Sequence, residues 1–86
     1  MKRYDESVIV HTGESGRPQR VQWRNRLYRV MHIEEEWRYT GKWWLGSSSW
    51  QRRYYRLAVC GAHNSQPCEM QIYRQGRRWI LCALYD

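Results

Sequence analysis

Apolar and aromatic residues alternate with polar ones along most of the chain, and helical spacing is weak throughout. Segments rich in Val, Ile, Tyr and Trp are separated by short stretches of Gly, Pro, Ser and Asn, which is typical of strands joined by turns. The pattern predicts six strands, over residues 4–10, 19–23, 27–40, 51–59, 68–74 and 78–86. We therefore predict an all-β domain, an antiparallel meander that forms a strongly bent sheet or a small open barrel.

The segments between these strands carry residues suited to turns. Residues 11–18 contain two Gly and a Pro, and residues 41–50 contain two Gly and three consecutive Ser, so both are predicted loops. A further loop is predicted over residues 60–67 and a turn over residues 75–77. Residues 24–26 form a tight connection, because Asn25 tolerates the left-handed backbone that a hairpin requires.

The segment 27–40 is the longest and least regular of the six. Its odd positions form an apolar face that Arg29 and Glu35 interrupt, made of Leu27, Met31, Ile33, Trp37 and Tyr39. We expect this strand to bend near the acidic run 34–36. One helical turn over residues 34–39 is the alternative, since Glu is a good helix former.

The composition points to one small domain with an acidic partner. Its 86 residues include six Trp and seven Tyr but no Phe, and the net charge is +7, with Arg supplying thirteen of the fifteen cations. Trp and Tyr combine a ring with a polar group and suit half-buried positions and interfaces. An Arg-rich surface favours nucleic acid, an anionic membrane surface or an acidic protein patch.

The chain shows no sign of membrane insertion or export. No apolar run approaches the roughly 20 residues of a membrane span, and the N-terminus lacks the pattern of a signal peptide. We expect a cytoplasmic protein with no membrane partner, in which the three Cys are thiols.

The sequence offers no recognisable catalytic set, so we do not expect an enzyme. None of His11, His32 and His63 lies in a context that pairs it with a nucleophile, and no nucleophile elbow surrounds the serines 47–49. Successive Glu residues on a strand point to opposite faces, so the run 34–36 does not provide an acid–base pair.

A zinc site is the one metal hypothesis that the sequence raises. Cys60, His63 and Cys68 give the spacing C-x₂-H-x₄-C, with Cys82 as a fourth possible ligand. Structural zinc sites usually have two close ligand pairs, which this pattern lacks. We favour Cys60 and Cys68 facing each other at the base of a hairpin, Cys82 as a small buried hydrophobe, and no metal or cofactor.

A basic and aromatic surface is predicted around residues 36–56 and the last turn. Alternation places Arg52, Tyr54 and Arg56 on one strand face, and Tyr55 and Leu57 with Arg53 on the other. The candidate phosphate contacts are Lys42, Arg52, Arg53, Arg56, Arg77 and Arg78, and the candidate stacking residues are Trp43, Trp44 and Trp50. Those three Trp could instead fold back as a hydrophobic plug, whereas Trp23, Trp37 and Trp79 lie within strands and are expected in the core.

Several segments carry a family resemblance: "RYDESVIV", "GRPQRVQWRNRLYRV", "GKWW", "RRYYRL", "IYRQGRRWIL" and the final "LYD". In their order they resemble a small uncharacterised bacterial domain, found as stand-alone proteins in actinobacteria. It is related to the C-terminal domain of catalytically dead Y-family polymerase homologues of the mutasome. The resemblance implies no catalytic residues and suggests a role in DNA damage tolerance.

Two functional hypotheses follow. The first is a non-enzymatic nucleic-acid-binding module, an accessory in DNA repair or replication, with DNA favoured over RNA as the expected partner. The second is a module for protein interaction or self-association, in which the same Trp, Tyr and Arg residues contact a repair protein or a second copy.

Overall fold

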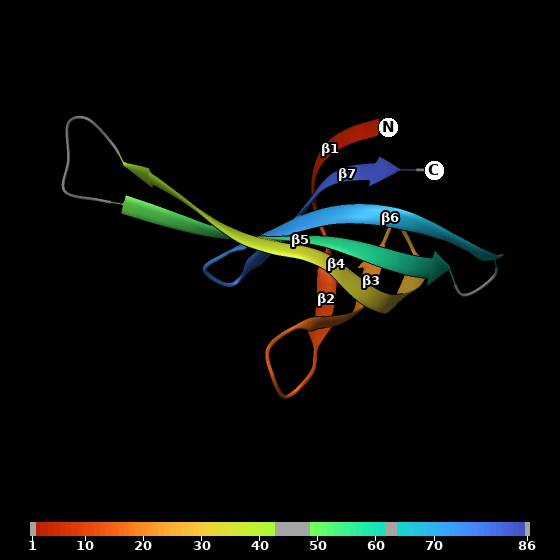
Figure 1. Cartoon of the computed structure of the whole chain (residues 1–86). Coiled ribbons are helices and arrows are strands. Elements are labelled where there is room, and N and C mark those ends of the chain that lie inside the picture. The colour runs from red at the N-terminus through yellow and green to blue at the C-terminus, as the bar shows by residue number, and fades with distance from the viewer. Residues whose placement is uncertain (1, 43–48, 62–63, 86) are drawn as a thin grey trace.

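The computed structural model describes residues 2–42, 49–61 and 64–85 as seven antiparallel strands in one sheet (Figure 1). The strands are β1 (Lys2–Ser7), β2 (Ile9–Thr12), β3 (Pro18–Trp23), β4 (Arg26–Lys42), β5 (Ser49–Gly61), β6 (Asn64–Gln75) and β7 (Arg78–Tyr85). The described part of the chain contains no helix, and so none that could cross a membrane. The predicted all-β class and antiparallel meander are confirmed.

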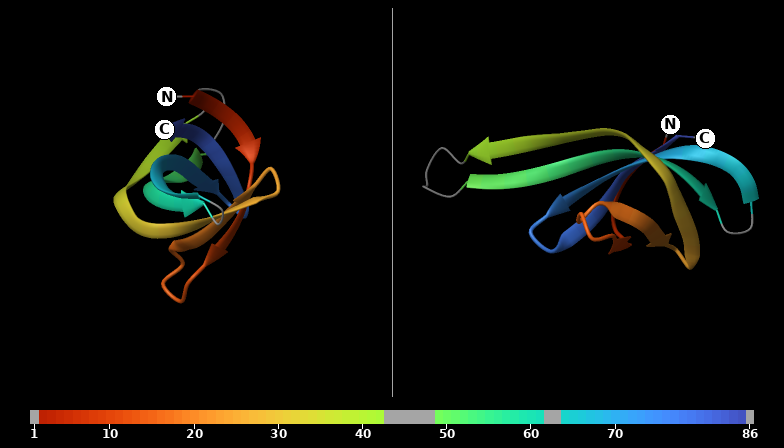
Figure 2. Two further views of the ribbon diagram at one scale, coloured as in Figure 1. Left: turned by 90° about the vertical axis from the view of Figure 1, so that its right-hand side faces the viewer. Right: turned by 60° about the horizontal axis from the view of Figure 1, so that its bottom comes forward.

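The first predicted strand is two strands, which explains why the sheet has seven and not six. β1 pairs with β7, and β2 pairs with β3. The break falls at Val8, whose side chain is buried and whose N–H donates to the carbonyl of Trp79 at 3.0 Å. β1 and β2 are the two outermost strands of the sheet, so the chain passes from one edge of the sheet to the other at Val8. The sheet is strongly curled into a half-barrel (Figure 2).

The turns have the backbone conformations that their residues predicted, but two of the predicted loops are shorter in the structure. Arg24 and Asn25 have φ values of 51° and 62°, as a two-residue type I′ hairpin requires. Gly76 has a φ of 63° in the connection between β6 and β7. The boundaries predicted for the loops 41–50 and 60–67 are wrong, because β4 runs to Lys42, β5 begins at Ser49 and β6 begins at Asn64.

β4 bends without leaving the sheet. Its pairing with β5 shifts between Val30 and His32 and again between Ile33 and Glu35, and such bulges bend a strand and increase its twist. The helical turn considered over residues 34–39 is therefore wrong, because pairing with β5 continues through that run. The single apolar face predicted on the odd positions is also wrong: Met31 is 55% exposed, because the first bulge changes which positions face inward.

The core lies on one face of the curled sheet, called here the inner face. Seven side chains are less than 2% exposed and come from β3, β5, β6 and β7: Tyr55, Leu57, Met70, Ile72, Leu81, Val21 and Val59. Trp23 is buried beside them, and its indole N–H donates to Glu6 Oε2 at 3.2 Å. Trp37 and Trp79 are only half-buried. Trp79 packs at the margin of the core, whereas Trp37 lies on the opposite face of the sheet, so the core position expected for Trp37 is wrong.

Candidate functional site

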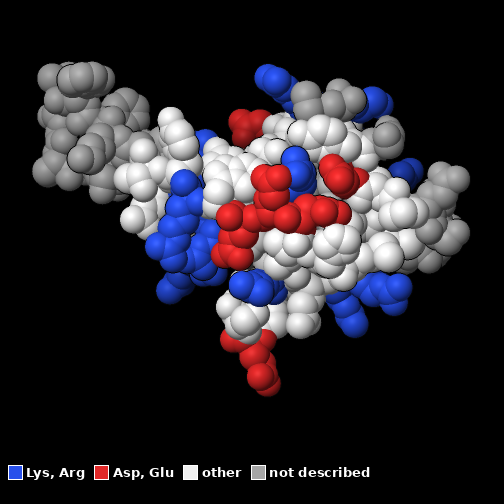
Figure 3. Space-filling view, viewed as in Figure 1, with Lys and Arg blue, Asp and Glu red and all other residues white. Residues whose placement is uncertain are grey.

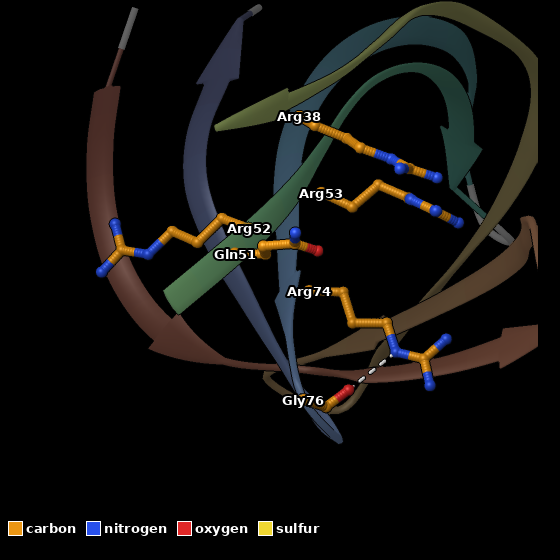
Figure 4. A pocket seen from close by; sticks show the side chains of 6 residues that line it. All are labelled: Arg38, Gln51, Arg52, Arg53, Arg74 and Gly76. Carbon is orange, nitrogen blue, oxygen red and sulfur yellow. Dashed lines mark hydrogen bonds between the residues drawn. The ribbon is translucent and has the colours of Figure 1, made fainter. Parts of the chain in front are cut away.

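Three arginines lie side by side across β4, β5 and β6. Arg38 is directly opposite Arg53, and Arg53 is directly opposite Arg74. All three side chains extend from the same face of the sheet (Figure 4). We call Arg38, Arg53 and Arg74 the arginine row. It continues the inner face beyond the core, since Arg53 has the same strand parity as Tyr55 and Leu57.

The arginine row borders a pocket of about 270 Å³, which Gln51, Arg52 and Gly76 also line. The Nε of Arg74 donates to the carbonyl oxygen of Gly76 at 2.9 Å. The Arg74 guanidinium also lies 5.6 Å from the centre of the Trp79 ring. These two contacts orient Arg74 before any ligand arrives.

The positive charge of the arginine row is only partly balanced within the protein. Oε1 of Glu36 lies 4.0 Å from the Nε of Arg53, while its Oε2 lies 3.6 Å from the Nε of Arg17. In the described residues, no other carboxylate forms an ion pair with the row. Figure 3 shows Lys and Arg side chains gathered where the β4–β5 hairpin leaves the body, next to a cluster of acidic side chains.

The opposite, outer face of the same strands carries an aromatic row, made of Trp37, Tyr54 and Tyr73. Trp37 is directly opposite Tyr54, and Tyr54 is directly opposite Tyr73. The rings of Trp37 and Tyr54 are stacked, with centroids 5.3 Å apart and planes 3° apart. The Tyr54 and Tyr73 centroids are also 5.3 Å apart, with the rings tilted by 43°. The row is therefore a continuous set of ring contacts across three strands.

Arg52 is tied to this aromatic row. Its Nε donates to Gln75 Oε1 at 3.1 Å, its Nη1 donates to the Tyr54 hydroxyl at 3.3 Å, and its guanidinium lies 4.4 Å from the Tyr73 ring centre. The hydrogen bond to Tyr54 raises the pKa of Arg52. Partial burial raises the pKa of Tyr73, and burial raises the pKa of the Cys82 thiol to about 11. Arg56, on the same face as Arg52, forms an ion pair with Glu35.

The structure divides the predicted phosphate contacts among three places. Arg53 belongs to the arginine row, whereas Arg52 and Arg56 lie on the outer face. Arg77 and Arg78 are exposed where β6 turns into β7, and Arg78 lines a pocket of about 470 Å³ with Arg52 and Tyr73. Trp43 and Trp44 lie outside the described residues. Lys42 and Trp50 lie in β4 and β5, and their side chains are not described.

Sequence reasoning missed Arg38 and Arg74 as site residues. Like Arg53, each lies next to an aromatic residue that faces the other side of the sheet. The sequence does not show which positions on separate strands lie opposite one another. The register across β4, β5 and β6 brings them together.

The proposed pairing of two Cys at a hairpin base is wrong. Cys60 lies opposite Pro67, and Cys68 lies opposite Val59. Because Val59 is a core residue on the inner face, Cys68 shares that face and Cys60 points to the other. Within the described ranges, no three His, Cys, Asp or Glu residues are grouped as a metal site would require. His63 lies outside those ranges.

The fold and the two rows define a small, all-β domain whose inner face carries the core and the arginine row and whose outer face carries the aromatic row. The entire chain, residues 1–86, matches the family described as Domain of unknown function (DUF6504), and the protein belongs to that family. No curated protein and no solved structure matched the chain.

Proposed function

We propose that this domain is a non-enzymatic nucleic-acid-binding module. The observation that carries the proposal is the arginine row, three directly opposed arginines of which only Arg53 pairs with a carboxylate, that of Glu36, which it shares with Arg17. Like charges placed opposite each other on neighbouring strands destabilise a sheet. A phosphate ligand offsets that repulsion, and the planar guanidinium fork matches phosphate oxygens.

The aromatic side chains favour nucleic acid over other polyanions. Single-stranded nucleic acid is bound where a positive groove follows the backbone and aromatic rings stack on bases. Half-buried Trp79 lies opposite Arg74 in the β6–β7 register, so an aromatic surface adjoins the arginine row. The resemblance to the C-terminal domain of inactive polymerase homologues favours DNA as the ligand and an accessory role in repair or replication.

The experiment that tests this function is a salt titration of binding to single- and double-stranded DNA and RNA. Three phosphate contacts give a log–log slope of about −2 on a single strand and about −2.7 on a duplex. Arg53→Gln should reduce the magnitude of the single-strand slope by about 0.7. Arg56→Gln is the matched control, because it removes an arginine of the same strand that lies on the outer face and does not line the pocket. No binding at low salt, or a slope near zero, would contradict the proposal.

A second candidate function is protein interaction, and the free edge of β4 favours it. β4 pairs with β3 only over residues 26–29, so the stretch 30–42 has no strand on that side among the described residues. Met31 and Tyr39 in this stretch are 55% and 56% exposed. An extended segment of another chain can add a strand to such an edge. Association that persists at high salt, measured by light scattering, would support this candidate over nucleic-acid binding.

A further inference from the structure

We infer that the arginine row binds a terminal phosphate of a nucleic-acid strand, a phosphomonoester. This inference rests on the proposed function and names the part of the ligand that the row recognises. The two observations behind it are the concentration of charge around a single pocket and the orientation of Arg74 by contacts within the protein.

The charge concentrated at the row suits a dianion better than a chain of monoanions. A phosphodiester carries one negative charge, whereas a phosphomonoester carries about −1.5 to −2 near pH 7. Arg38 and Arg53 are direct cross-strand neighbours, and no ion-pair partner reaches Arg38 within the described part of the chain. One monoester can neutralise both guanidinium groups, whereas one diester neutralises about half of their charge.

The geometry supplies donors for the three free oxygens of a monoester. Neighbouring strands lie about 4.8 Å apart, so the row spans about 10 Å across three strands and borders one pocket. Arg38 and Arg53 extend in parallel, and Arg74 extends from the same side of the sheet (Figure 4). The Nε of Arg74 is held by Gly76, which leaves its terminal nitrogens available to donate.

Trp79 indicates the direction in which a bound strand extends from the arginine row. It lies opposite Arg74 in the β6–β7 register, and its ring centre is 5.6 Å from the Arg74 guanidinium. We expect the terminal nucleoside to extend towards this ring from a phosphate bound by the row. Aromatic stacking accepts any base. The site is therefore expected to select the strand end and not its sequence.

The test compares single-stranded DNA oligonucleotides of about 12 nucleotides, identical in sequence and internally labelled. One has a 5′ phosphate, one has a 3′ phosphate, and one has hydroxyl groups at both ends. Near pH 7, we expect a phosphorylated strand to bind about tenfold more tightly than the hydroxyl strand, as for one added charge-assisted contact. The preference should shrink as the pH falls below about 6, where the monoester gains a proton.

Two variants connect the preference to the row. Arg53→Gln should abolish it, while Arg77→Gln should keep it, because Arg77 is exposed at the β6–β7 turn and does not line the pocket. If Arg53→Gln fails to fold by circular dichroism, Arg38→Gln replaces it, since Arg38 is exposed and has the same role.

The outcomes separate this inference from the proposed function. Equal, salt-dependent binding of all three strands would overturn the inference and leave nucleic-acid binding standing. Binding of none would overturn both. A phosphate preference that survives in Arg53→Gln and Arg38→Gln would overturn the assignment to the arginine row. The arm that binds more tightly, 5′ or 3′, identifies the end recognised.

Discussion

The arginine row and the aromatic row occupy adjacent positions on the same three strands, yet they are built in opposite ways. Arg38 follows Trp37, Arg53 precedes Tyr54 and Arg74 follows Tyr73 in the sequence. Each arginine faces inward, and its aromatic neighbour faces outward. On the outer face, each described arginine of β5 has a partner within the protein. On the inner face, Arg53 shares the Glu36 carboxylate with Arg17, and neither Arg38 nor Arg74 has a carboxylate partner among the described residues.

This difference separates arginines that stabilise the fold from arginines that are available to a ligand. Arg52 makes two hydrogen bonds and lies over a ring, and Arg56 forms an ion pair with Glu35. Such contacts contribute to stability. The arginine row instead places like charges in register, which costs stability. Residues that cost stability at a surface pocket are the better candidates for function.

The largest effect predicted is on the aromatic row. Tyr54→Ala should lower the free energy of unfolding by about 2–3 kcal/mol, below the 3–5 kcal/mol range for large aromatics in a core because Tyr54 is half-buried. The substitution removes two ring contacts and the acceptor for Arg52. Urea unfolding measures the loss. Tyr54→Phe is the control and should cost about 1 kcal/mol or less, since it keeps the rings in contact.

If Tyr54→Ala costs no more than Tyr54→Phe, the ring contacts do not stabilise the sheet. The outer face would then lose its structural role, and the contrast between the two rows would disappear.

The second prediction compares neighbours on opposite faces. Arg52→Gln should lower the free energy of unfolding by about 1 kcal/mol, after allowance for solvent exposure of its contacts. Arg53→Gln should leave it unchanged or raise it by a few tenths of a kcal/mol, because it relieves the repulsion from Arg38 and Arg74. For nucleic-acid affinity the order should reverse, with the larger loss in Arg53→Gln. Equal effects of both variants on stability would contradict the division of roles.

Alternation along β5 allowed its two faces to be predicted from the sequence. Tyr55 and Leu57 are buried, which confirms that Arg52, Tyr54 and Arg56 face the other way. The turn at Asn25 was equally predictable, because few residues adopt a positive φ without strain. Local chemistry decides both features, so a single sequence is enough to infer them.

The arginine row could not be predicted from the sequence, because it depends on the register between strands, which the alternation within one strand does not contain. Two bulges in β4 shift its residues relative to β5, and only the resulting register places Arg38 opposite Arg53. The same limit explains the wrong pairing of Cys60 with Cys68. Pairing also decides the break at Val8. Residues 4–10 have the pattern of one strand, but the part before Val8 pairs with β7 and the part after it pairs with β3, at opposite edges of the sheet.

The third prediction concerns the response of stability to alkaline pH. Burial raises the pKa of Cys82 from 9.0 to about 11 and also raises the pKa of Tyr73. Between these values the folded state binds more protons than the unfolded state, so the free energy of unfolding should fall as pH rises from about 9 to 11. Below about pH 9 both states hold the thiol proton, and this contribution is fully present.

Urea unfolding at several alkaline pH values measures this loss. Cys82→Ala should remove the part of the slope due to the thiol and leave the part due to Tyr73. A slope between about pH 9 and 11 that is identical in the variant would show that the Cys82 thiol does not contribute.

The smallest effect predicted is the response of stability to salt. Repulsion in the arginine row is screened as the Debye length falls from about 10 Å at 0.1 M to about 3 Å at 1 M salt. Screening also weakens the favourable ion pairs, such as that of Arg24 with Glu6, so the total change in the parent protein mixes both signs. The difference between the parent and Arg53→Gln isolates the interactions of Arg53, namely its repulsion from Arg38 and Arg74 and its 4.0 Å pair with Glu36, because the other pairs are common to both. We expect added salt to stabilise the parent by a few tenths of a kcal/mol more than this variant.

Arg52→Gln, which removes a partnered arginine, should not reduce the response in this way. Sodium chloride is the suitable salt, because sulfate and phosphate also strengthen burial and would bind the row. If Arg53→Gln responds to salt as the parent does, the three guanidinium groups do not repel one another measurably. Relief of repulsion would then not favour the binding of an anionic ligand to the row.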